Sequence, residues 1–181
     1  MIDFIHPGLV LILGSLLLPV LPKNMRSFYS VLLAMLGFIL CLMTNPGVYG
    51  SLNLFGYTIS PIIRVDKLSL LFAYIFSFIG LIGIIYCYHI DDWVQQLAGL
   101  MYAGASIGVS FAADILSFYL FWEMLSFLAV LLIWSQRTKE ATSTGFRYIM
   151  VHITGGLFLF AGVIIYIYQT GSFDFSSFMN H

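Results

Sequence analysis

Runs of about twenty apolar residues recur along this chain, and they limit its possible folds more than any other feature. A helix needs roughly 20 mostly apolar residues to cross a lipid bilayer. The sequence predicts six such helices, over residues 4–21, 28–44, 68–88, 94–112, 115–134 and 146–168. The predicted fold class is therefore all-α, a polytopic helical membrane protein with about six transmembrane helices.

The composition agrees with a membrane setting. Hydrophobic residues make up 61% of the chain and charged residues 8%, whereas a soluble domain carries roughly 25% charged residues. A soluble fold of this length could not hide so much apolar surface. The net charge of −1 leaves no basic footprint for nucleic acid. We therefore expect a lipid bilayer and other membrane proteins as partners, and no nucleic acid.

The links between the apolar runs divide the chain into three parts. Residues 1–64 hold the first two helices and an external loop, residues 65–170 hold helices three to six, and residues 171–181 form a short aromatic tail. In the external loop, Leu54 and residues 57–59 flank Gly56 and predict a short hairpin.

Two shorter patterns predict local helix geometry. Asp66 stands just before the third predicted helix, where a carboxylate suits the helix dipole and favours a structural cap. Gly104 and Gly108 form a small-xxx-small pair in the fourth predicted helix. Such pairs let two helix backbones approach closely in membranes.

Basic residues concentrate on the odd-numbered loops and predict the orientation. Five lie in or beside the first and fifth loops, and two lie in the second: Lys23, Arg26, Arg137, Lys139 and Arg147 against Arg64 and Lys67. Because cytoplasmic loops carry the excess of Lys and Arg, we expect the odd-numbered loops inside and both termini outside.

Glu123 is the only ionisable side chain between Ile115 and Trp134, and it lies at the centre of that run. A carboxylate at bilayer depth costs at least about 2.5–3.5 kcal/mol. Such residues mark ion or proton pathways, although they also act as hydrogen-bonding contacts between helices. Tyr119 and Ser126 fall on the same helical face as Glu123 and extend it into a thin polar stripe.

His152 is the second candidate, near the start of the sixth predicted helix. Histidine titrates near neutral pH and can relay protons, but a hydrogen-bonded packing role fits its position as well. Arg137, Lys139 and Arg147 are possible modulating charges for Glu123. The alternative, which positive-inside anchoring favours, is that they hold the loops in the cytoplasm.

The sequence carries no pattern for a metal or cofactor. It lacks CxxC, H-E-x-x-H, phosphate-loop and dinucleotide motifs, and Cys41 and Cys87 stand alone in apolar runs. We therefore expect no catalytic residue, no metal and no cofactor. Redox chemistry, if the chain serves a redox-driven complex, is expected in another subunit.

Three segments carry a resemblance to a known family. DKLSLLFAYIFSFIGLIGIIY, DILSFYLFWEMLSFLAVLLIW and FRYIMVHITGGLFLFAGVIIY together resemble the antiporter-like membrane subunits. That family includes a large membrane subunit of Mrp-type Na+/H+ antiporters and the proton-pumping subunits of respiratory complex I and membrane-bound hydrogenases. The F-W-E-M segment is the most specific, and the resemblance implies that Glu123 is the ion-path acid.

The resemblance also implies what this sequence does not contain. Family members have about fourteen spans in two inverted repeats, and their glutamate pairs with a lysine on a broken seventh helix. The six predicted helices form an incomplete first repeat of the antiporter-like fold, without that lysine. A split subunit, a truncated product and a reduced accessory subunit all fit, and a partner subunit is expected to supply the lysine.

The functional hypothesis is a transporter subunit, not an enzyme, that takes part in proton or sodium/proton translocation. We expect it in a multisubunit complex of a bacterial or archaeal inner membrane, such as an NADH dehydrogenase-like, hydrogenase-like or Mrp complex. The alternative is a non-conducting scaffold or assembly subunit of such a complex.

Overall fold

The computed structural model describes residues 4–50, 52–54, 57–59, 62–90 and 92–175. In this part of the chain the fold is built from six α-helices and one 3₁₀ turn: α1 (Pro7–Ser15), α2 (Lys23–Met43), α3 (Lys67–Tyr86), η1 (Cys87–His89), α4 (Trp93–Phe111), α5 (Ile115–Trp134) and α6 (Lys139–Thr170). The predicted helical fold with about six helices is confirmed.

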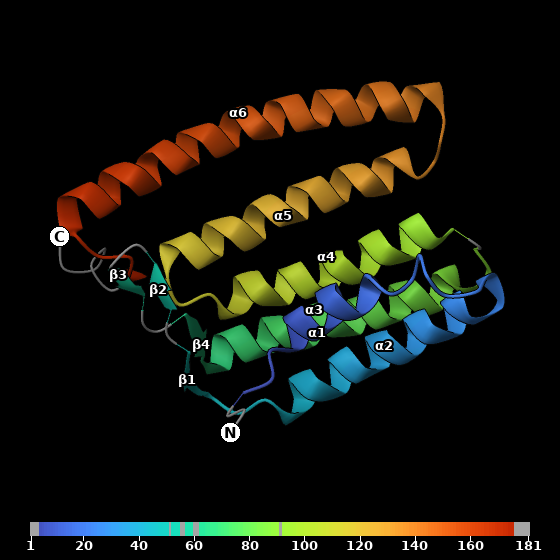
Figure 1. The fold of residues 1–181 in the computed structure, drawn as a ribbon, viewed down its shortest axis with the longest axis horizontal. Coiled ribbons are helices and arrows are strands. Elements are labelled where there is room, and N and C mark those ends of the chain that lie inside the picture. Colours follow the sequence, from blue (N-terminus) through green and yellow to red (C-terminus); the bar gives the residue numbers. More distant parts are fainter. Residues whose placement is uncertain (1–3, 51, 55–56, 60–61, 91, 176–181) are drawn as a thin grey trace.

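The helices run up and down in an elongated bundle (Figure 1). α5 and α6 lie side by side along one edge, and α4 separates them from the group formed by α1, α2 and α3. The connections α1–α2, α3–α4 and α5–α6 gather at one end of the bundle, and the short strands lie at the other. Each odd-numbered loop therefore lies at the end away from the strands.

α4 is the centre of the packed half. It contacts α1, α3 and α5, and its buried positions include Leu100, Ile107 and Phe111. Gly104 lies where the α4 backbone meets α1, so that a Cβ there would come within 2.6 Å of the carbonyl oxygen of Gly8. The small-residue pattern of α4 thus packs helices, as predicted.

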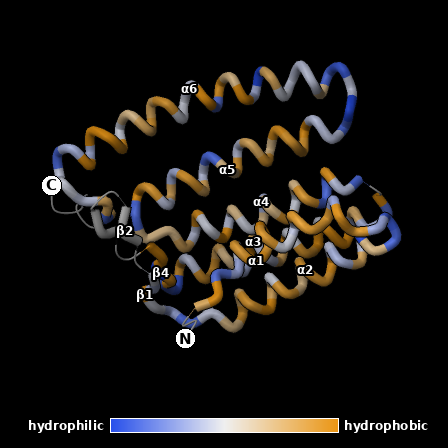
Figure 2. Tube along the Cα trace, in the orientation of Figure 1, coloured by the Kyte–Doolittle hydropathy of each residue, from blue (hydrophilic) through white to orange (hydrophobic). Residues whose placement is uncertain are grey.

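Four helices of the described residues are long and apolar enough to cross a membrane: α2, α3 together with η1, α5 and α6. Orange apolar residues run along most of their length in Figure 2. α4 falls outside this group because it carries Gln95, Gln96 and several small residues. These residues suit α4 because neighbouring helices surround it. Gln96 is buried and bonds Ser30 and Ser27 of α2 at 2.9 Å each.

Two helices differ in length from the prediction. α1 ends at Ser15 and continues as turns through Val20, because Pro19 has no N–H to offer a helix and its ring opposes the preceding turn. α6 begins at Lys139, seven residues before the predicted start. The Thr138 side chain caps it by accepting a hydrogen bond from the Ala141 N–H at 3.0 Å. The helix therefore extends beyond its apolar run.

Strands close the end of the bundle opposite the basic loops. β2 (Leu52–Leu54) pairs with β3 (Tyr57–Ile59) in the predicted antiparallel hairpin; Gly56 itself lies outside the described residues. β1 (Gly47–Tyr49) pairs with β4 (Ile63–Val65) around this hairpin. β4 leads directly into α3, whose start is fixed by a capping box between Asp66 and Ser69.

Candidate proton-path site

Glu123 lies in the middle of α5 and faces α6. Its side chain is only 19% exposed, and its Oε1 atom is buried without a hydrogen-bond partner among the described residues. The α6 backbone comes close at Gly156, where an added Cβ would collide with Oε1. Glycine at this position therefore makes room for a carboxylate between the two helices.

His152 and Ser126 complete a polar contact across the same helix pair. The Nε2 atom of His152 lies 3.9 Å from Oε2 of Glu123. The Ser126 hydroxyl hydrogen-bonds the His152 ring, 3.2 Å from Nδ1 and closer to Nε2. It also lies 3.3 Å from the carbonyl oxygen of Trp122. A hydroxyl can donate and accept, so Ser126 can relay a proton to or from the imidazole.

Tyr119 lies one helical turn before Glu123, and its hydroxyl is close enough to interact with that carboxylate. The Tyr119 ring stacks on Phe160 of α6 with centroids 5.2 Å apart. All four residues predicted for the path, Tyr119, Glu123, Ser126 and His152, thus come together at the α5–α6 contact.

The aromatic surroundings of His152 were not singled out by the sequence. Trp122 packs against the imidazole with ring centroids 4.8 Å apart, and Tyr148 stacks on it at 6.0 Å with nearly parallel planes. The available signals were the adjacency of Trp122 to Glu123 and the four-residue spacing from Tyr148 to His152. These rings limit the orientations open to the imidazole.

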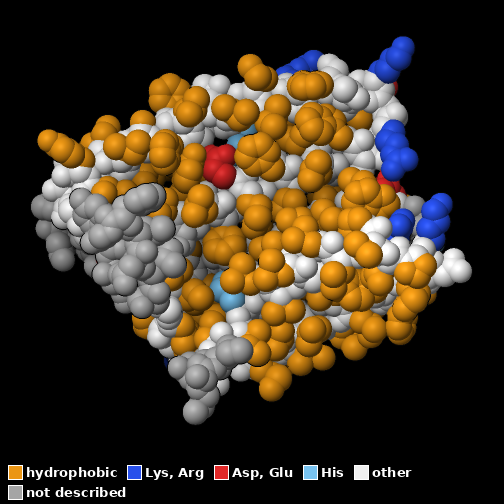
Figure 3. All heavy atoms as spheres, in the orientation of Figure 1, with side chains coloured by type: hydrophobic (Ala, Val, Ile, Leu, Met, Phe, Trp, Pro, Cys, Tyr) orange, Lys and Arg blue, Asp and Glu red, His pale blue; other side chains and the backbone are white. Residues whose placement is uncertain are grey.

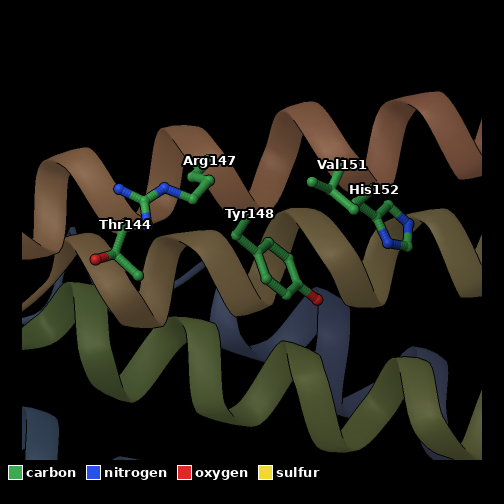
Figure 4. A pocket seen from close by; sticks show the side chains of 5 residues that line it. All are labelled: Thr144, Arg147, Tyr148, Val151 and His152. Atoms are coloured by element: carbon green, nitrogen blue, oxygen red, sulfur yellow. The ribbon is translucent and has the colours of Figure 1, made fainter.

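A groove runs along α6 toward this site. Thr144, Arg147, Tyr148, Val151 and His152 line it, and Figure 4 shows the five side chains spread over two turns of one side of the helix. The groove joins a guanidinium near the basic end of the bundle to an imidazole beside Glu123.

The candidate modulating charges lie at different distances from Glu123. Arg137, in the α5–α6 connection, pairs with Asp92 at 3.0 Å, and Lys139 begins α6. Lys139 precedes Gly156 by 17 residues, or about 25 Å along a helix, and Arg147 precedes it by nine, or about 13 Å. The structure thus brings neither Arg137 nor Lys139 to the carboxylate, and Arg147 comes nearest of the three.

The surface shows the same separation of charge. In Figure 3 Lys and Arg atoms gather at the end of the bundle away from the strands, while acidic and histidine atoms interrupt the apolar face over α5 and α6. Within the described residues no group of three or more His, Cys, Asp or Glu side chains could hold a metal.

Comparisons with known proteins agree with this architecture. Residues 112–181, which include α5 and α6, match the family described as NADH:quinone oxidoreductase/Mrp antiporter, TM. Over 123 residues the chain is 32% identical to Na(+)/H(+) antiporter subunit A1 of Staphylococcus aureus strain bovine RF122 / ET3-1, which covers 65% of this chain and 15% of that protein. The chain thus spans about 15% of the length of the curated relatives it matches.

Solved membrane complexes share the fold. A chain of the membrane-bound sulfane sulfur reductase, an archaeal respiratory membrane complex, superposes with a TM-score of 0.81 at 22% identity, over 94% of this chain and 28% of that one. A chain of the Mrp complex from Dietzia sp. DQ12-45-1b gives 0.81 at 19%, over 94% and 20%. One from Thermus thermophilus respiratory complex I gives 0.78 at 18%, over 93% and 38%.

This protein is a helical, multi-pass membrane protein. It is related to the antiporter-like membrane subunits of Mrp and complex I-like assemblies, so the resemblance expected from the F-W-E-M segment is confirmed.

Proposed function

We propose that this chain takes part in proton translocation as one subunit of a multisubunit membrane complex, with Glu123 as the ion-path acid. The observation that carries the proposal is the buried, unpartnered Oε1 of Glu123 at the α5–α6 contact, with His152 3.9 Å from the other carboxylate oxygen. Acids at bilayer depth mostly serve ion pathways.

In this mechanism Glu123 alternately holds and releases a proton. The His152 imidazole accepts it in one step, and the Ser126 hydroxyl, which bonds that ring, passes it on. Tyr119 stabilises the carboxylate from the opposite side of the contact. Water entering beside these groups connects the path to the membrane surface. Because the relatives by sequence are named Na(+)/H(+) antiporter subunits, sodium is the proposed counter-ion.

A lysine from another membrane subunit is the proposed partner of Glu123. Oε1 lacks a hydrogen-bond partner among the described residues, and an ammonium group placed beside it would favour the ionised carboxylate. Arg147, in the groove that leads to His152, is the charge of this chain best placed to adjust that balance. Redox chemistry, where the complex uses it, belongs to other subunits.

The proposed orientation puts the basic end of the bundle in the cytoplasm. Lys23, Arg26, Arg137 and Lys139 lie at or near that end, and positive loops stay inside. Both chain ends are then outside.

The test is Glu123→Gln in the assembled complex, with transport followed in vesicles as proton flux driven by a sodium gradient. Loss of most of the flux is expected, because glutamine has nearly the same shape and cannot carry the proton. Glu140→Gln is the matched control, since Glu140 is exposed in the first turn of α6, and it should keep wild-type flux. Unchanged flux in Glu123→Gln, with normal assembly, would reject the proposal.

The second candidate, a non-conducting scaffold, is favoured by the many apolar side chains that α6 leaves uncovered. A scaffold would hold other membrane helices against that face. The same variants separate the two functions. A scaffold would show the same flux in Glu123→Gln and in Glu140→Gln, whereas a change to Phe158→Asp on the uncovered face would disrupt assembly.

A further inference from the structure

Three helices of this protein begin with the same device. Asp66, Asp92 and Asp114 precede α3, α4 and α5, and in each the Oδ1 atom accepts backbone N–H groups of the first turn at 2.8–3.0 Å. An aspartate at this position stabilises a helix start. The three residues therefore form a matched set in which the second carboxylate oxygen can be compared.

The second oxygen of Asp114 differs from the others. Asp66 is exposed to its surroundings, and Oδ2 of Asp92 accepts a hydrogen bond from Arg137 at 3.0 Å. Asp114 is 1% exposed, and its Oδ2 is buried without a hydrogen-bond partner among the described residues. An ionised oxygen buried in this way is costly. Its surroundings should therefore supply a partner or a proton.

Asp174 is the group that the fold brings opposite Asp114. The two residues form an antiparallel bridge, and the Ile115 N–H donates to the Phe173 carbonyl oxygen at 3.0 Å beside it. This pattern makes Asp114 and Asp174 a non-hydrogen-bonded pair, with Cα atoms about 4.5 Å apart and side chains on one side. Two negative charges directly opposite one another in such a pair repel.

The other elements near the bridge bring no ion pair to Asp114. From α6, the Tyr166 hydroxyl donates to the backbone carbonyl oxygen of Asp174 at 2.6 Å. From β4, Ile63 pairs with Ala112, and the neighbouring Arg64 is exposed. The last residue of α4, Phe111, is apolar and buried. Among the described residues no basic side chain forms an ion pair with Asp114.

We propose that Asp114 and Asp174 share one proton and form a second protonation site, at the strand end of the bundle. A carboxylic acid proton on Oδ2 of Asp114, donated to the Asp174 carboxylate, satisfies the buried oxygen and removes the like-charge repulsion. The site begins the helix that carries Glu123, nine residues or about 13 Å earlier along its axis. It can hold a proton at the end of α5 opposite the basic loops, whether or not Glu123 conducts.

The test measures the carbonyl absorption of protonated carboxyl groups by infrared difference spectroscopy in the assembled complex. It is done in the Glu123→Gln background, so that Glu123 contributes nothing and transport plays no part in the readout. Asp114→Asn and Asp174→Asn should each remove the same single band. Asparagine still accepts the capping hydrogen bonds, so α5 should begin normally.

Asp66→Asn and Asp92→Asn are the matched controls and should leave the band in place. The proposal is overturned if neither Asp114→Asn nor Asp174→Asn changes the protonated-carboxyl signal, or if the band lost in one remains in the other, since the proton would then not be shared. Should Asp114→Asn fail to assemble, persistence of the band in Asp174→Asn alone still rejects the shared site.

Discussion

The two halves of the helix bundle use similar apolar sequences in different ways. α4 buries ten of its 19 residues and α6 four of its 32, although both helices are rich in apolar and small residues. Glycines show the same contrast: Gly104 lies against the backbone of α1, while Gly155 and Gly162 of α6 have no neighbour within 4 Å.

The difference teaches where chemistry and packing are divided. The packed half around α4 satisfies its polar groups internally, as Gln96 does with Ser27 and Ser30. The open half formed by α5 and α6 keeps a carboxylate oxygen of Glu123 unpartnered and His152 beside a groove. Polar groups left in this state at bilayer depth need water, a proton or another subunit, which suits a transport role better than a structural one.

The largest effect on stability is expected from closing the tight contact in the packed half. In Gly104→Ala the new Cβ would meet the Gly8 carbonyl oxygen at 2.6 Å and Ile12 at 2.9 Å, so α1 and α4 must separate. We expect a destabilisation of about 1–3 kcal/mol, seen as a lower thermal midpoint of the purified complex. Gly83→Ala is the control, because nothing lies within 4 Å of that position. Equal midpoints for the two variants would contradict the contrast between the halves.

The open half should respond in transport and not in stability. Gly156→Ala places a methyl group against Oε1 of Glu123 and displaces the carboxylate from His152. Because small misplacements of reacting groups are costly, we expect the proton flux to fall roughly tenfold with little change in thermal midpoint. The neighbouring Gly155→Ala, which faces open space, should leave the flux unchanged. If both variants transport alike, the position of Glu123 against α6 does not matter.

The smallest effect is expected at the exposed cap of α3. The hydrogen bond from the Ser69 backbone lowers the pKa of the Asp66 carboxyl, so the ionised form stabilises the fold. This contribution is fully present above the ordinary value of 3.8 and is lost as the pH falls through the lowered folded value. Asp66→Ala should cost about 1 kcal/mol at neutral pH.

The difference in thermal midpoint between wild type and Asp66→Ala should therefore shrink as the pH is lowered below 3.8. A difference that stays constant with pH would mean that the charge of Asp66 is not what stabilises the start of α3.

Sequence patterns predicted most of the helices because hydrophobic length is a local property. α5 runs from Ile115 to Trp134, the predicted bounds, since polar residues flank that run on both sides. The prediction was less accurate where capping, and not hydropathy, sets the boundary. Thr138 starts α6 seven residues before its apolar run, and the turns before Pro19 and Pro22 shorten α1.

The candidate site was predicted in part for the same reason. Tyr119 and Ser126 follow from the helical spacing around Glu123, and His152 from its place in an apolar run. Trp122 and Tyr148 could not be assigned to the imidazole, because their contacts depend on how α6 lies across α5. Asp114 was missed because its burial and its pairing with Asp174 join residues sixty positions apart.

The sequence by itself determined that this is a helical membrane protein with a carboxylate at the centre of its fifth helix, since both follow from the order of apolar and charged residues. Only the tertiary structure decided what that carboxylate faces. Gly156 gives it room, His152 stands beside it and Ser126 holds the imidazole, because the α5–α6 crossing brings together residues that no local pattern relates.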